Sequence, residues 1–165
     1  MEQGQTPSQL HERLGSTQRQ TIEQERAKQA WSNIRSIKKL ENKDLEKKYR
    51  SLARGLNAMI QVNGLGPTLG FFYAKWRTKQ KEQGQAEPKK TEHYYLLEHL
   101  SQWMRTHFKA SNSSTMGTNF NGLLSWVTHE QTTSADYRRA TTECLAFGVW
   151  LRRFAEAELE DDVKA

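Results

Sequence analysis

The sequence predicts an all-α protein, a compact bundle of about five to seven helices. Three observations carry this prediction. Apolar residues recur at helical spacing along most of the chain, no stretch alternates with the period of two typical of strands, and only three of the 165 residues are proline. A chain of this length is expected to form one domain with a single sizeable core.

The first helix is expected to begin near residue 21. Residues 1–20 are polar and rich in Gln, Ser and Thr, which is typical of a flexible leader. Thr21 can act as the N-cap, and the apolar positions that follow, such as Ile34 and Ile37, lie on one helical face. A break at Glu41-Asn42 then separates this helix from the next.

A sharp corner is predicted after the second helix. Apolar residues from Leu45 to Ile60 follow the i, i+3/i+4, i+7 spacing of an amphipathic helix. Gly64 can end it in the left-handed conformation, and the fixed φ of Pro67 suits the first turn of a third helix. The corner consists of Asn63, Gly64, Leu65 and Pro67.

The second half of the chain predicts three further helices. The third helix loses its periodicity toward a loop near 78–92, and Thr91 can cap a fourth helix. A Ser/Asn/Gly-rich loop near 109–118 precedes a short apolar helix, and Ser134 can cap a long last helix. We therefore expect a single helical domain over 21–160 and an acidic tail over 161–165.

The charge distribution indicates a polyanionic partner. The net charge is +6, yet residues 26–109 contain 18 Lys and Arg against seven Asp and Glu, whereas residues 156–162 contain five acidic residues and no basic one. A basic body is typical of nucleic-acid binding. The alternative is a solvated basic surface that serves only solubility.

The sequence favours an intracellular protein without catalytic machinery. It has one cysteine, no signal-peptide pattern and no apolar run long enough for a membrane span, so we expect a cytoplasmic location and no membrane contact. Cys144 lies on an apolar stripe and is expected to be inert. The five histidines lack metal-ligand spacing and no nucleotide-binding motif is present, so neither a metal nor a cofactor is expected. An acid–base site assembled across helices is the alternative.

Basic side chains on two helices are the candidate contacts for a phosphate backbone. Long basic side chains on helix faces can bind phosphates without reading sequence, although a solvated face is the alternative for each. Four further basic residues, 75, 77, 79 and 81, cover the end of the third helix. The candidates are Lys47, Lys48, Arg50, Arg54, Arg138, Arg139, Arg152 and Arg153.

The stretch KKYRSLARGLNAMIQVNGLGPTLGFFYAK resembles the core signature of the small all-helical subunit of the type III-B CRISPR effector, the Cmr or RAMP module complex. The stretches ERAKQAWSNI, YYLLEHLSQWM and DYRRATTECLAFGVWLRRFAEAEL are similar to its opening, middle and closing segments. The likeness covers about residues 22–159. Within the core signature, the matching positions are Tyr49, Ser51, Ala53, Met59, Ile60, Asn63, Gly64, Leu65, Thr68, Leu69 and Phe71.

This resemblance implies a non-catalytic RNA-binding subunit of an antiviral defence complex. In that family, copies of the subunit stack as a filament beside the backbone subunits and line the path of the guide and target RNA. The implied partners are other subunits of the complex, copies of the chain itself, and the guide and target RNA backbone. A stand-alone helical adaptor is the main alternative, with an enzyme as the second.

Overall fold

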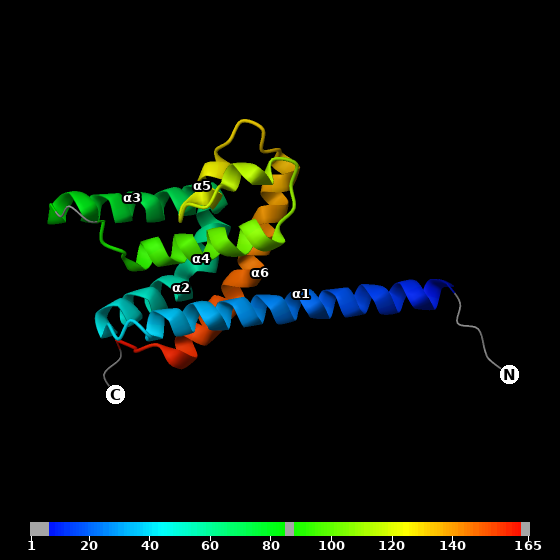
Figure 1. Ribbon diagram of the computed structural model, residues 1–165, viewed down its shortest axis with the longest axis horizontal. Coiled ribbons are helices and arrows are strands. Elements are labelled where there is room, and N and C mark those ends of the chain that lie inside the picture. Colours follow the sequence, from blue (N-terminus) through cyan, green and yellow to red (C-terminus); the bar gives the residue numbers. More distant parts are fainter. Residues whose placement is uncertain (1–6, 85–87, 163–165) are drawn as a thin grey trace.

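The protein is all-helical over the residues that its structure, a computed structural model, describes. These are residues 7–84 and 88–162, with the backbone alone described for 7–20 and for Gln83. Six α-helices and one 3₁₀ helix follow one another without a strand in this part of the chain (Figure 1). The predicted all-α fold is therefore confirmed.

The elements appear in the order that the apolar pattern predicted. Their bounds are α1 Pro7–Lys38, α2 Lys43–Asn63, α3 Leu65–Gln83, α4 Glu92–His107, η1 Ser113–Met116, α5 Gly122–Val127 and α6 Ser134–Glu158.

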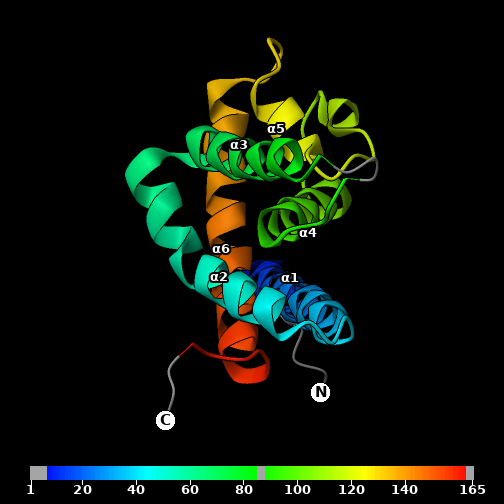
Figure 2. The same ribbon diagram turned by 90° about the vertical axis from the view of Figure 1, so that its left-hand side faces the viewer.

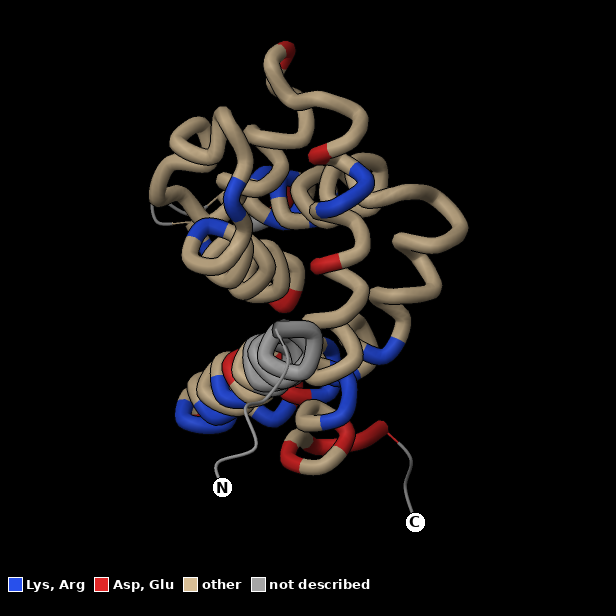
Figure 3. The backbone as a smooth tube through the Cα atoms, turned by 90° about the vertical axis from the view of Figure 1, so that its right-hand side faces the viewer, with Lys and Arg blue, Asp and Glu red and all other residues tan. Residues whose placement is uncertain are grey.

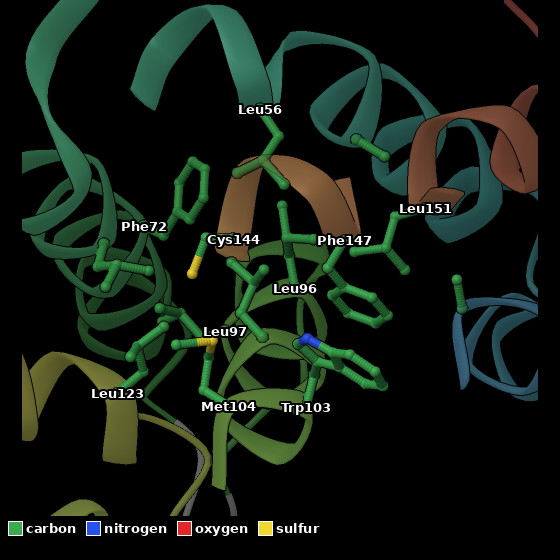
Figure 4. Close-up of a cluster of buried hydrophobic side chains, with 14 of the residues drawn as sticks. Leu56, Phe72, Leu96, Leu97, Trp103, Met104, Leu123, Cys144, Phe147 and Leu151 are labelled. Atoms are coloured by element: carbon green, nitrogen blue, oxygen red, sulfur yellow. The ribbon is translucent and has the colours of Figure 1, made fainter. Parts of the chain in front are cut away.

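Helix α6 is the centre of the fold. It spans the height of the molecule, with α1 packed against it at one end and α3, α4 and α5 grouped toward the other (Figure 2). Its stripe of small and large apolar residues, among them Cys144, Phe147 and Leu151, is fully buried. These residues meet Leu56 of α2 and Trp103 of α4 in one core, in which the Trp103 and Phe147 rings stack at 4.8 Å between their centroids (Figure 4).

Helix α1 begins earlier than the sequence predicted. It starts at Pro7, so the prediction that Thr21 caps it is wrong. Residues 8–20 contain no proline and many good helix formers, and a polar sequence of this kind is compatible with a continuous helical backbone. The first half of α1 accordingly projects beyond the rest of the fold (Figure 1). Of the expected leader, residues 1–6 lie outside the described residues.

The corner between α2 and α3 has the predicted positive φ but not the predicted ψ. Gly64 has φ +90° and ψ +163°, which is an extended conformation that glycine alone adopts readily, rather than the left-handed helical one. Its N–H bonds to Ile60 O at 2.8 Å and its carbonyl accepts the Thr68 hydroxyl at 2.7 Å. One residue therefore ends α2 and begins α3, with Leu65 fully buried behind it.

The remaining helix ends agree with the sequence in place and differ in detail. Asn42 caps α2 by accepting the Leu45 N–H at 3.1 Å. Thr133, not Ser134, caps α6, since its hydroxyl accepts the Asp136 N–H at 3.1 Å. Helix α3 extends to Gln83 and ends at Gly84 with φ +55°, which shortens the loop expected over 78–92.

Candidate nucleic-acid interface

Arg50, at the middle of the predicted basic stripe on α2, is largely enclosed. Its guanidinium donates hydrogen bonds to the backbone carbonyls of Glu156 and Leu159, both at 2.9 Å, and pairs with Asp161 at 2.9 Å. Only 15% of its side chain is exposed. A guanidinium held by three oxygens from the C-terminal end of the chain serves first to fix that end to α2.

The acidic segment, residues 156–162, compensates most of the other basic charge on this face. Arg54 pairs with Glu156 at 3.3 Å and with Asp161 at 3.8 Å, and Lys47 lies 3.9 Å from Asp162. The acidic segment lies beside α2, with acidic and basic residues intermixed there (Figure 3). The basic residues of α2 that the sequence suggested as phosphate contacts are thus paired largely with carboxylates of the acidic segment.

Arg152 of α6 joins the same network. It pairs with Glu156 at 3.2 Å, so this carboxylate is shared by two arginines. The slight burial of Glu156 alone would raise its pKa, but the hydrogen bonds and charges of Arg152 and Arg54 lower the pKa overall. Its neighbour Arg153 is exposed and forms no salt bridge with any described residue.

Lys48 also has a carboxylate partner. It pairs with Asp44 at 2.8 Å, one helical turn earlier on α2. The hydrogen bond to Asp44 raises the pKa of Lys48, which keeps the ammonium group charged. An exposed pair of this kind is weak enough that a phosphate can compete for the lysine.

The two arginines at the start of α6 lie at the other end of the molecule. Arg139 pairs with Asp136 at 2.7 Å and covers the Phe108 ring, with 5.0 Å from its guanidinium carbon to the ring centroid. Arg138 is exposed and has no salt bridge within the described part of the chain. Arg152 lies fourteen positions after Arg138, so the two arginines are about 21 Å apart along the helix. The eight candidates therefore do not form one surface.

A second basic region, which we call the α3–α4 basic group, has no carboxylate partners among the described residues. No acidic residue occurs from 65 to 81, which was the signal in the sequence. All its side chains are exposed, and Lys75 and Lys90 lie 5.4 Å from the ring centroids of Phe71 and Tyr94. The sequence pointed to the first four members and missed the last two: Lys75, Arg77, Lys79, Lys81, Lys89 and Lys90.

The buried titratable groups are poorly suited to acid–base chemistry. The Tyr49 hydroxyl and His99 Nδ1 form a hydrogen bond at 2.7 Å inside the core. Burial lowers the pKa of His99 to about 3, so this imidazole is neutral at physiological pH. Burial also raises the pKa of Cys144, which keeps its thiol protonated and unreactive.

Residues 22–158 match the protein family described as CRISPR-associated protein (Cas_Cmr5). The chain belongs to the Cas_Cmr5 family. It is therefore a small subunit of the CRISPR type III-B effector, the Cmr complex, and the resemblance seen in the sequence is confirmed.

The family match coincides with the packed part of this Cas_Cmr5 chain. It begins at Ile22, inside α1, and ends at Glu158, the last residue of α6. The projecting first half of α1 and the last residues of the acidic segment lie outside it. None of the described helices of the Cas_Cmr5 chain is long and apolar enough to cross a membrane.

Proposed function

We propose that this Cas_Cmr5 chain is a non-catalytic structural subunit that lies along the guide and target RNA of the type III-B complex and contacts the RNA backbone by charge. It acts in the cytoplasm. It also packs against other subunits and against further copies of itself in a filament. The observation that carries the proposal is the α3–α4 basic group, because its six exposed cations have no carboxylate partners among the described residues.

Free cations are what backbone recognition requires. A phosphate contact releases counterions only when the basic side chain is not already neutralised by a protein carboxylate. Among the eight residues that the sequence suggested, Arg138 and Arg153 meet this condition within the described chain. We therefore assign the main phosphate contacts to the α3–α4 basic group, with Arg138 and Arg153 as additional contacts. The α2 side chains contribute where RNA displaces the acidic segment.

The proposal that the chain is not an enzyme rests on its titratable groups. His99 is buried and neutral, Cys144 is buried, and Glu143 is held between Arg26 and Trp103. Groups engaged in this way stabilise the fold and are poorly placed to exchange protons with a substrate.

Packing against neighbouring subunits is supported by apolar side chains that the fold leaves in solvent. Val62, at the end of α2, is 82% exposed, and Phe71 of α3 is 44% exposed. Leu40 and Val149 are each 47% exposed. Singly exposed apolar residues are common at protein surfaces, so these four are candidate contact positions and do not define one patch.

The test is RNA binding by the assembled type III-B complex. A complex that contains Arg77→Glu and Lys81→Glu is expected to bind target RNA more weakly. The slope of log affinity against log salt should fall by about 0.7 for each lost contact to single-stranded RNA.

Lys28→Glu with Lys39→Glu is the matched control, because both lysines are exposed, lie far from this region in sequence and have no salt bridge within the described residues. Equal loss of affinity in the two variants would contradict a specific contact. An unchanged affinity and slope in the Arg77/Lys81 variant would remove the α3–α4 basic group from the RNA path.

A further inference from the structure

A small pocket lies at the N-terminus of α4. Its volume is about 70 Å³, and it is formed by the start of α2, the end of α3 and the segment before α4. This is room for a group of a few heavy atoms and too little for a nucleoside. The side chains that surround it include Lys48, Lys79, Lys89, Lys90, Thr91 and Glu92.

The charge around the pocket is positive. Lys79, Lys89 and Lys90 form no salt bridge with any described residue. Four lysines line the pocket against two carboxylates, of which Asp44 pairs with Lys48 at 2.8 Å and Glu92 lies 3.3 Å from the His93 imidazole. Three ammonium groups are thus available to an anion from outside.

The N-terminus of α4 adds unpaired donors. Thr91 occupies the N-cap position of this 16-residue helix, yet its side chain accepts no hydrogen bond from the first-turn N–H groups, of which only the Glu92 N–H bonds to a side chain within the described residues, that of Glu92 itself. Thr91 is only 8% exposed, and its hydroxyl oxygen has no hydrogen-bond partner there. Free N–H groups at the positive end of a helix favour an anion, and a buried hydroxyl without a partner favours a ligand that bonds to it.

The segment before α4 is held in place by the end of α3. The Lys89 N–H donates to Gln80 Oε1 at 2.6 Å, and the Lys89 carbonyl accepts from Gln80 Nε2 at 2.9 Å and from Trp76 Nε1 at 3.0 Å. The backbone at Lys89 is therefore held in place before any ligand arrives. A fixed backbone lowers the entropic cost of binding.

We propose that this pocket binds one phosphate group. Lys79, Lys89 and Lys90 supply the charge, and the Thr91 hydroxyl with the first N–H groups of α4 supplies the directed hydrogen bonds. If the proposed function holds, the phosphate belongs to the RNA backbone that passes the α3–α4 basic group. A free phosphate or the terminal phosphate of a nucleotide offers the same chemistry.

The test is a titration of the full-length chain followed by the NMR shifts of its backbone amides. Three probes separate the sources: inorganic phosphate, uridine 5′-monophosphate, and a short oligouridylate without terminal phosphates. We expect saturable shifts at His93, Tyr94 and Lys90 with the oligouridylate. Shifts there with only the first two probes would also establish the phosphate site but assign it to free or terminal phosphate.

Two variants test the assignment of ligands. Lys89→Gln with Lys90→Gln should weaken binding at least about fivefold, since each removes a charge-assisted contact. Thr91→Val removes the hydroxyl with little change of shape and should weaken binding about threefold to fivefold. Lys28→Gln with Lys39→Gln removes the same net charge elsewhere and should change binding less than about twofold.

Amide shifts that spread over all basic surfaces without saturation would contradict a phosphate site in this pocket. Equal weakening of binding by the Lys89/Lys90 variant and by the Lys28/Lys39 control would contradict it as well. Such a failure is distinct from failure of the proposed function. The proposed function is tested by Arg77 and Lys81, which do not line this pocket, and by the affinity of the assembled complex.

Discussion

The hydroxyl oxygen of Tyr137 accepts a hydrogen bond from the backbone N–H of Gly66 at 2.7 Å. Gly66 lies in the first turn of α3, where a backbone N–H has no partner inside the helix. Tyr137 lies in the first turn of α6, far along the chain. This single bond therefore ties the corner between α2 and α3 to the central helix.

Replacement of Tyr137 by Phe should destabilise the protein by about 1 kcal/mol, because the Gly66 N–H loses its acceptor while the ring remains. Urea unfolding of the isolated chain followed by circular dichroism measures this. Tyr73→Phe is the matched control, since the Tyr73 hydroxyl forms no hydrogen bond with the described residues, and it should change the free energy of unfolding by less than about 0.5 kcal/mol. Equal effects of the two substitutions would argue against a role for the Tyr137 hydroxyl.

Gly64 is the other element of the corner. Its φ of +90° is strained for any residue with a Cβ atom, although the nearest atoms, Pro67 Cδ and the Tyr137 hydroxyl, leave space at 3.6 and 3.8 Å. Gly64→Val should therefore destabilise by at least about 1 kcal/mol through backbone strain alone. A thermal melt compared with the wild-type chain measures the loss.

Gly55 provides the control for Gly64. It lies inside α2, and a Cβ atom there would meet no atom within 4 Å. Gly55→Val should be neutral or slightly stabilising, because valine has a higher helix propensity than glycine. A melting temperature of Gly64→Val no lower than that of Gly55→Val would contradict the strained corner.

The corner illustrates how much of the fold the sequence contained. The apolar series that ends at Ile60, followed by Asn-Gly and then Pro, predicted a helix end and a glycine with positive φ, because these depend on local geometry. The ψ of Gly64 and the bond from Tyr137 depend on where α6 lies relative to α3, and that is set by packing across the whole core.

The candidate interface shows the same division. The sequence identified which residues are basic and which helix faces they occupy. It gave no sign that Arg50 would bind the backbone of residues 156 and 159, because that contact depends on the angle at which α6 crosses α2. Residues 65–81 of the α3–α4 basic group contain no acidic residue, which was a visible signal, but Lys89 and Lys90 join the group only through the packing of α3 against the start of α4.

Stability should depend on pH through His99. Burial lowers the pKa of His99 from 6.5 to about 3. Below pH 6.5, His99 binds a proton in the unfolded chain but stays neutral in the folded protein. The free energy of unfolding is therefore highest above pH 6.5 and decreases as the pH falls toward 3. The loss at pH 5 should be about 2 kcal/mol, measured by urea unfolding across pH.

His99→Gln should flatten this dependence between pH 6.5 and 4.5, whatever its effect on absolute stability. Glu143→Gln is the companion variant. Burial alone would raise the pKa of Glu143, but hydrogen bonds from Arg26 and Trp103 lower it below 4.5. The stabilisation by the ionised Glu143 carboxylate is therefore present above pH 4.5 and is lost as the pH falls through the lowered pKa. Glu143→Gln should accordingly change the pH dependence of stability only below pH 4.5. If the free energy of unfolding of His99→Gln still changes with pH near 5.5 as steeply as that of the wild-type chain, the His99 imidazole is not the source of the pH dependence.

The last prediction concerns the contact between Arg50 and Asp161. Asp161 pairs with both Arg50 and Arg54, and its removal leaves Arg50 bound to two backbone carbonyls while Arg54 loses one of its two anions. Asp161→Asn should therefore cost less than about 1 kcal/mol of stability, because Arg50 keeps its two backbone acceptors and the Arg54–Asp161 pair, at 3.8 Å, is partly exposed. It should also strengthen binding of single-stranded RNA by the isolated chain, since Glu156 is then the one carboxylate that Arg54 and Arg152 share among the described residues.

The salt dependence separates a new contact from a general change in charge. One additional phosphate contact should steepen the slope of log affinity against log salt by about 0.7. Glu158→Gln removes one negative charge from the same segment, and Glu158 is exposed without a salt bridge to any described residue. It should leave the slope unchanged. If both variants strengthen RNA binding equally, the effect is one of net charge, and the acidic segment does not compete with RNA for the arginines of α2.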